Sequence, residues 1–321
     1  MPIKLIHPIS GRDLKEQADV LSDDQGNSFE KIQGVYRMVT GNNYTDSFGF
    51  QWNKFSQTQI DPDSKVTQSR ERFFGETGWK ASDLGGAAIL EVGSGAGRFT
   101  QVILQDTAAT VYSVDFSSAV EANFRNNGHF GGRLQLFQAS IYELPFPDNS
   151  FAKVFCFGTL QHTPDFEGAV RALIRKAKPG GEIVVDFYPI KGWWTKINSK
   201  YILRPLTKRM SRARLYNIIE SNIDWLIAAH LALSRVGLHV LTRFLPVCDI
   251  TATFPKRLAG PRMREWAILD TFDMYSPEHD HPQRVGNVAA MFARNGAAVT
   301  FAGFKAIGEG KFAAVVKGVK R

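Results

Sequence analysis

Short apolar runs recur through the middle of the chain, and polar or amphipathic segments separate them. Each run is five or six residues long and predicts a buried strand, at 87–92, 110–115, 134–138, 152–157 and 182–187. The segments between them carry apolar residues at helical spacing, at 98–105, 117–126 and 167–177. Because strands that alternate with helices pair in parallel and bury both faces, this rhythm predicts an α/β fold with a doubly wound sheet.

The rhythm stops on both sides of this core, which divides the chain into four segments. They are a loop-rich N-terminal cap at 1–65, the core at 66–189, a helical insertion at 190–264 and the C-terminal part of the core at 265–321. Alternating patterns near the end predict two more strands, at 298–302 and 312–319. We therefore expect a seven-stranded, mostly parallel, Rossmann-like sheet.

Composition narrows the class of protein without identifying it. The chain is 44% hydrophobic and 22% charged, as is typical of globular proteins, and has only two cysteines, Cys156 and Cys248. Two cysteines form neither a disulfide framework nor a zinc ribbon. The N-terminus lacks the apolar run of a signal peptide, and no stretch of about 18 uncharged apolar residues is present. We expect a cytoplasmic protein that can lie at the inner face of the membrane.

The positive charge of the chain is concentrated in the insertion. Residues 190–264 contain fourteen Lys/Arg and three Asp/Glu, whereas the whole chain has a net charge of +8. Such a segment predicts contact with an anionic partner, unless it is only a solvated face. Three partners are compatible: an anionic acceptor such as a nucleotide-sugar or lipid-linked pyrophosphate, a membrane surface contacted through Trp193 and Trp194, and nucleic acid.

Three glycines at alternate positions follow the first core strand. Gly93, Gly95 and Gly97 let the backbone turn sharply and let a ligand approach, and the next helix points its N–H groups at that ligand. A dinucleotide-binding loop would need glycine at position 98, where this chain has Arg98. With Glu91 before it, the segment reads Glu-x-Gly-x-Gly-x-Gly. It resembles the first motif of class I S-adenosylmethionine (SAM)-dependent methyltransferases, which implies that Glu91, Gly93, Ser94, Gly95 and Gly97 bind the cofactor.

Two further segments extend the resemblance. Asp115 ends the second strand, where such folds hold a ribose, with Phe116 beside it; alternatively Asp115 caps the next helix. Residues 137–151 contain the Leu-Pro-Phe segment of the same methyltransferases. Ser140 stands where the family has an acidic residue that contacts the adenine amino group, and a serine can still accept a hydrogen bond. Ile141 would pack against the adenine ring or simply belong to the core.

The loop after the fourth strand carries the candidate for chemistry. Its sequence, from Phe157 to Asp165, resembles the Leu-x-His-x-x-Asp loop of small-molecule methyltransferases. The resemblance implies that Phe157 contacts the cofactor and that His162 contacts the cofactor or acceptor. An imidazole can also act as a base near neutral pH, or it can make only a structural hydrogen bond. Lys-Pro-Gly-Gly at 178–181 completes a resemblance that covers about residues 85–190.

The flanks resemble a narrower group. Residues 43–55 and 269–277 are similar to type 11-like bacterial methyltransferases associated with surface-polysaccharide and glycan biosynthesis. Relatives often begin Cys-Pro-x-x-Gly, but this chain has His7 in place of the cysteine, so we expect no zinc there. A polar cluster follows: Asp273, Tyr275, His279, Asp280 and His281. It predicts an acceptor pocket, an exposed loop or a divalent-metal site.

The function expected is SAM-dependent O-methylation of a small-molecule or glycan-type acceptor that is anionic. Because the cofactor activates its own methyl group, the protein mainly aligns the reactants. His162 and then Asp273 are the candidates for a catalytic base, and we expect no metal. Candidates for the acceptor pocket are Tyr188, Tyr275, His279 and His281. Two alternatives are an RNA methyltransferase that docks through the basic insertion and a non-catalytic SAM-binding or scaffold protein.

Overall fold

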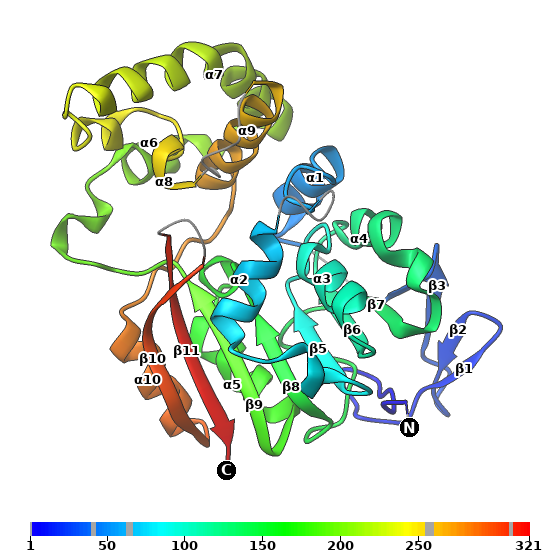
Figure 1. Ribbon diagram of the computed structural model, residues 1–321. Helices are drawn as coiled ribbons and strands as arrows, with labels where there is room; N and C mark the ends of the chain where they lie inside the picture. Colours follow the sequence, from blue (N-terminus) through cyan, green and yellow to red (C-terminus); the bar gives the residue numbers. More distant parts are fainter. Residues whose placement is uncertain (1, 40–42, 62–66, 254–259, 308–310) are drawn as a thin grey trace.

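A computed structural model describes residues 2–39, 43–61, 67–253, 260–307 and 311–321 of the chain. The described residues form one sheet of eleven strands in the order β1-β2-β3-β4-β7-β6-β5-β8-β9-β11-β10 (Figure 1). Seven of them match the predicted strands: β5 (Ala88–Val92), β6 (Thr110–Asp115), β7 (Leu134–Gln138), β8 (Phe151–Cys156), β9 (Ala177–Phe187), β10 (Ala297–Ala306) and β11 (Phe312–Lys320). The strands from β7 to β9 pair in parallel, whereas β11 is antiparallel to both β9 and β10.

The prediction of seven strands was wrong in number, because four short strands from the N-terminal region extend the sheet. They are β1 (Lys15–Gln17), β2 (Val20–Ser22), β3 (Ser28–Ile32) and β4 (Val35–Arg37). β4 joins the sheet by pairing in parallel with β7. Tyr36 is buried there and stacks on Phe137. Strands of three to five residues are too short for alternation to distinguish them from loops.

Helices cover both faces of the sheet, as the doubly wound prediction requires. On one face α5 (Phe166–Lys176) and α10 (Val285–Arg294) pack their apolar side chains on the central strands. On the other face lie α2 (Gln68–Thr77), α3 (Arg98–Asp106) and α4 (Val120–Asn127). Burying each large apolar side chain contributes about 2 kcal/mol, so these two layers fix the positions of the strand ends.

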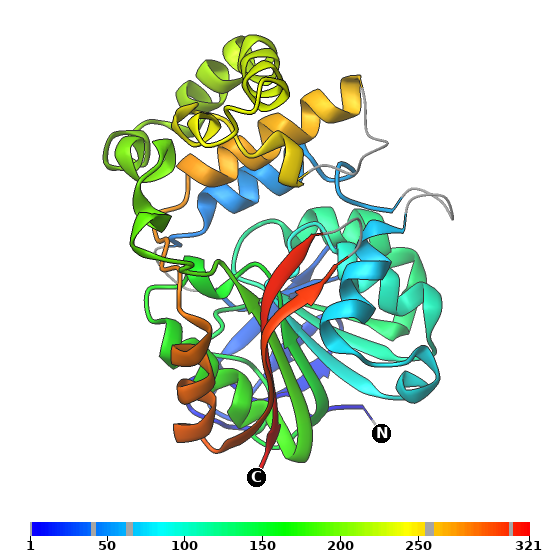
Figure 2. The same ribbon diagram turned by 60° about the vertical axis from the view of Figure 1, so that its left-hand side comes forward.

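A separate helical layer lies beyond the carboxyl ends of the central strands (Figures 1 and 2). It contains α6 (Ser199–Thr207), α7 (Arg212–Arg235), α8 (Ile250–Thr253) and α9 (Pro261–Tyr275), with short 3-10 turns at Trp193–Lys196 and Leu241–Phe244. Its own core joins α7 residues such as Ile223 to Trp266 and Phe272 of α9. Phe55, which follows α1 (Asp46–Lys54), enters the same core and connects this layer to the N-terminal region.

The described residues of the insertion form no helix that could span a membrane. Within the described ranges, no helix combines the necessary length with the necessary apolar character. Lys256 and Arg257, two of the basic residues counted in the insertion, lie outside the described residues.

Candidate functional site

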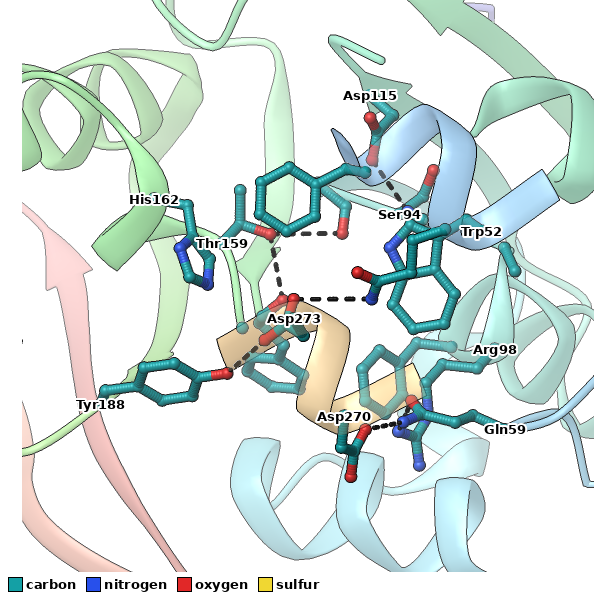
Figure 3. Close-up of a pocket in the computed structure, with 18 of the residues that line it drawn as sticks. Trp52, Gln59, Ser94, Arg98, Asp115, Thr159, His162, Tyr188, Asp270 and Asp273 are labelled. Atoms are coloured by element: carbon teal, nitrogen blue, oxygen red, sulfur yellow. Dashed lines mark hydrogen bonds between the residues drawn. The ribbon is translucent and has the colours of Figure 1, made fainter. Parts of the chain in front are cut away.

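A large cavity lies between the carboxyl ends of the strands and the helical layer. Its volume is about 890 Å³, and its walls come from the glycine loop, the loops after β6 to β9, and helices α1, α2 and α9. Figure 3 labels ten of the lining residues, which converge from segments more than 200 positions apart in the chain. This is where open α/β sheets bind ligands, because the loops that follow parallel strands diverge at that edge.

The glycine loop forms one wall and has no room for side chains. Gly93 and Gly95 have φ angles of +82° and +54°, in the left-handed region that favours glycine. A Cβ on Gly93 would collide with Thr159, and a Cβ on Gly95 would lie 3.1 Å from the indole ring of Trp52. The loop therefore presents bare backbone to the cavity.

Asp115 organises this wall and also faces the cavity. Its Oδ2 accepts a hydrogen bond from the backbone N–H of Gly95 at 2.8 Å. Its Oδ1 accepts from the backbone N–H and the hydroxyl of Ser117, at 2.8 and 2.6 Å. Burial raises the pKa of the carboxyl, and these hydrogen bonds oppose that rise. The same side chain thus orders the turn before α4 and stays available to a ligand.

Seven of the residues predicted to bind the cofactor line the cavity: Gly93, Ser94, Gly95, Asp115, Phe116, Ile141 and Phe157. Gly97 instead begins α3, where a Cβ would collide with Asn123. Ser140 closes a turn by accepting a hydrogen bond from the N–H of Tyr142 at 3.2 Å. Neither of these two residues lines the cavity.

Glu91, also predicted to bind the cofactor, points into the protein behind the glycine loop. Its Oε2 accepts hydrogen bonds from the hydroxyls of Thr100 and, at 3.0 Å, Ser113. Burial raises the pKa of this carboxyl to about 7. Glu91 therefore holds β5, β6 and α3 together and is not a lining residue. The motif could not distinguish these roles, because both place an acceptor before the first glycine.

His162 lies in a 3-10 turn, Leu160–His162, and its ring is buried at the cavity wall. Its Nδ1 lies 3.1 Å from the backbone oxygen of His279. Because a carbonyl can only accept, Nδ1 carries the proton and Nε2 of the neutral ring keeps its lone pair. Burial is the main cause that lowers the pKa of His162, and Lys200 adds to it, while Asp273 and Asp280 oppose it.

Asp273 and Tyr188 lie beside His162 (Figure 3). The Tyr188 hydroxyl donates a hydrogen bond to Oδ2 of Asp273 at 3.0 Å, and Nε2 of Gln51 lies 3.5 Å from Oδ1. The rings of His162 and Tyr188 meet edge to face, with centroids 5.6 Å apart. Burial and then the Asp273 carboxylate raise the pKa of Tyr188, so its hydroxyl stays protonated and donates. This group can accept and position a hydroxyl.

Three of the four residues predicted to line the acceptor pocket do not line the cavity. Tyr275 ends α9 and is buried in the helical layer, where its hydroxyl donates to Ser199 at 2.9 Å. The backbone oxygen of His279 faces His162, and its ring stacks on that of His281 at 5.8 Å and meets the ring of Tyr44, a cavity-lining residue, edge to face at 5.4 Å. His281 is held by its N–H, which donates to the carbonyl of Gln161 at 2.7 Å. Within the described part of the chain, no three His, Cys, Asp or Glu side chains form a group that could hold a metal ion.

The structure adds a polar group that the sequence did not reveal. Gln59 bridges two buried charges, accepting from Nη1 of Arg98 at 2.7 Å and donating to Asp270 at 3.1 Å. Burial lowers the pKa of Arg98 to about 10 and raises the pKa of Asp270 to about 7. Among the described residues, no carboxylate forms an ion pair with Arg98. In the sequence Arg98 was visible only as the residue that breaks the dinucleotide pattern.

Comparison with known proteins identifies the core. Residues 90–185 match the family model of a methyltransferase domain. The chain is 29% identical over 99 residues to sterol 24-C-methyltransferase erg6 of Aspergillus fumigatus, covering 30% of this chain and 26% of that protein. It is 31% identical over 134 residues to the ubiquinone/menaquinone biosynthesis C-methyltransferase UbiE of Vibrio cholerae. That match covers 38% of this chain and 45% of that protein. It is 23% identical over 180 residues to methyltransferase GfsG of Streptomyces halstedii, and the match covers 54% of this chain and 61% of that protein.

These curated relatives are longer than the region they share with this chain, which spans between 26% and 61% of their lengths. A solved structure of magnesium protoporphyrin IX methyltransferase (ChlM) from Synechocystis PCC 6803 with bound SAH aligns with a TM-score of 0.48 and 14% identity. It covers 87% of this chain and 97% of that one. The family model identifies residues 90–185 as a methyltransferase domain, for which SAM is the cofactor.

Proposed function

We propose that this protein is a SAM-dependent methyltransferase that methylates an oxygen of a small-molecule or glycan-type acceptor. One observation carries the proposal: a single cavity contains both the bare glycine loop and the group formed by His162, Tyr188 and Asp273. A donor held at the loop and a hydroxyl held at this group would meet within one site. Effective alignment of two bound reactants supplies a large part of the rate enhancement in such transfers.

The cofactor would be held by the residues that line the loop side of the cavity. The Gly95 backbone and the Asp115 carboxylate offer polar contacts, and Phe116, Ile141 and Phe157 offer apolar ones. When bound, SAM supplies a methyl group on a positively charged sulfur. Trp52 covers Gly95 from the insertion side and would exclude water from this end of the cavity.

His162 is proposed as the base that removes the acceptor proton. Its ring is neutral because burial lowers its pKa, and its Nδ1 proton is fixed by the carbonyl of His279, so Nε2 can accept. When the acceptor oxygen takes the methyl group, the methyl–sulfur bond would break and leave a neutral thioether, while the proton of the acceptor would pass to Nε2 of His162. Asp273 would orient the hydroxyl by accepting a hydrogen bond, with Tyr188 holding the carboxylate in place.

Two cationic side chains of the cavity favour an anionic acceptor, although Asp115, Asp270 and Asp273 also line it. Arg98 and Lys191 line it, and neither forms an ion pair among the described residues. A buried guanidinium without a carboxylate is costly, and a phosphate or carboxylate on the acceptor would offset that cost. This favours a nucleotide-sugar or a lipid-linked saccharide over sterols and quinones, the compound classes that appear in the names of the relatives.

A turnover screen with radiolabelled SAM tests the proposal. Nucleotide-sugars, lipid-linked saccharides, the corresponding neutral glycosides and RNA would be compared as acceptors. We expect transfer to a phosphate-bearing saccharide, and Arg98→Gln should raise KM for it at least tenfold while changing KM for the neutral glycoside little. Transfer only to RNA, or an equal effect of Arg98→Gln on both saccharides, would overturn the assignment of the acceptor.

A further inference from the structure

One surface of the insertion leaves large apolar side chains uncovered. Eight of them belong to two neighbouring segments of the chain: Trp193, Trp194, Ile197, Val236, Leu238, Val240, Leu241 and Phe244. Trp193 is the most exposed, with 79% of its surface accessible. Scattered exposed apolar residues are normal, but a concentration of this size marks a contact surface. We call these eight residues the apolar surface.

Hydrogen bonds hold the two segments side by side. The guanidinium of Arg243 donates to the backbone oxygen of Trp194 at 2.5 Å. The hydroxyl of Ser199 donates to the backbone oxygen of Leu245 at 2.7 Å. The tryptophan pair and the 241–244 turn therefore form one surface, although they lie almost 50 positions apart in the chain.

The two chain segments that carry the apolar surface contain basic residues and no acidic ones. Residues 188–219 contain eight Lys/Arg and no Asp/Glu, and residues 225–248 contain two Lys/Arg and no Asp/Glu. Lys196 and Arg235 are exposed within these segments, next in sequence to Ile197 and Val236. Tryptophans with aliphatic side chains, interleaved with cations and free of carboxylates, match the interface of an anionic lipid bilayer.

We propose that the apolar surface docks this protein on an anionic membrane. The tryptophans and aliphatic side chains would enter the headgroup region, and the lysines and arginines would attract the anionic lipids. The same segment contributes Lys191 and Lys200 to the wall of the cavity, so docking would bring one wall of the site to the lipid surface. No described helix can cross a bilayer, so the contact proposed is peripheral.

The expected affinity for anionic vesicles is modest and depends on both the basic and the apolar side chains. Each Lys or Arg near an anionic surface contributes about 1 kcal/mol, which corresponds to roughly a fivefold change in binding. Inserted aromatic side chains add an apolar contribution that salt does not screen. Binding should therefore need anionic lipid and weaken, without vanishing, at high salt.

Vesicle co-sedimentation of the full chain tests the proposal. Vesicles of phosphatidylcholine alone would be compared with equimolar phosphatidylcholine and phosphatidylglycerol. We expect binding to the anionic vesicles, a loss of at least tenfold in Trp193→Ser/Phe244→Ser, and a several-fold loss in Lys196→Gln/Arg235→Gln. The matched control is Ile9→Ser/Ile32→Ser, which removes two exposed apolar side chains from the N-terminal region, outside the apolar surface. Ile9 is 74% exposed.

Two measurements keep the outcome decisive. Thermal melting would show that each variant is folded, and light scattering would give the mass of each in solution. Absence of binding by the wild-type chain, or equal binding by Trp193→Ser/Phe244→Ser, overturns the proposal. A third outcome also overturns it: the wild-type chain is a dimer that does not bind vesicles, and Trp193→Ser/Phe244→Ser is a monomer. In that case a second copy of the chain would cover the apolar surface. Vesicle binding does not depend on methyl transfer, so the two proposals fail independently.

Discussion

At the scale of single residues, protonation decides what the site can do. His162 is held neutral by burial, and its tautomer is set by the carbonyl of His279. Sequence reasoning identified this histidine from the loop after the fourth strand, but not the backbone contact that fixes its ring. It also assigned Glu91 to the cofactor, whereas the carboxyl lies behind the loop and bonds to Thr100 and Ser113. Spacing along a chain predicts which side chains are near a loop, not which side of it they face.

The lowered pKa of His162 predicts the pH dependence of the reaction. The folded pKa lies below the ordinary value of 6.5, so the ring is neutral at pH 7 and becomes protonated only as the pH falls below 6.5. Since only the neutral ring can accept a proton, we expect kcat/KM to fall on acidification, with an apparent pKa under 6.5.

The matched variant for this pH profile is His162→Gln, which keeps a polar side chain but cannot take up a proton. We expect it to reduce kcat by about 10² to 10⁴-fold and to abolish the acid limb. A variant that keeps the wild-type rate would remove His162 from the mechanism. An unchanged acid limb would assign the titration to another group, with Asp273 the next to test.

At the scale of elements, the sequence predicted the core well and the edges poorly. The seven core strands were found because each carries five or more apolar or alternating residues bounded by turns. The strands β1 to β4 were missed because they are too short to show a period. The polar wall near Arg98 was missed for another reason: Gln59 and Asp270 come from distant segments that only the packing of α1 and α9 brings together.

Helix α1 supplies the clearest test at this scale. Trp52 lies over Gly95, whereas Lys54 on the same helix is exposed. Because removal of the indole would open the glycine loop to water, we expect Trp52→Ala to weaken SAM binding at least tenfold. Lys54→Gln should leave the affinity unchanged. Calorimetric titration of both variants measures the difference, and equal affinities would show that α1 does not close the site.

At the scale of the whole molecule, three parts of the chain enclose one large cavity. The sheet supplies the loops, the N-terminal region supplies α1, and the helical layer supplies α9 with Asp270 and Asp273. A ligand bound between them should stabilise the folded state by about 2.7 kcal/mol at a hundredfold excess over its Kd. The sequence placed the donor side of this cavity through its motifs. The sequence did not predict the residues that line the acceptor side, because no local pattern indicates that α1 and α9 are in contact.

The most direct test of this account is calorimetric titration of SAM into the wild-type chain and into Gly95→Arg. We expect one SAM to bind per wild-type chain. Binding should be lost in Gly95→Arg, because the new side chain would fill the loop and meet Trp52. The matched control is Gly132→Arg, where a side chain meets open space, and it should bind as the wild type does. Absence of binding to the wild type, or undiminished affinity in a folded Gly95→Arg variant, would contradict the account.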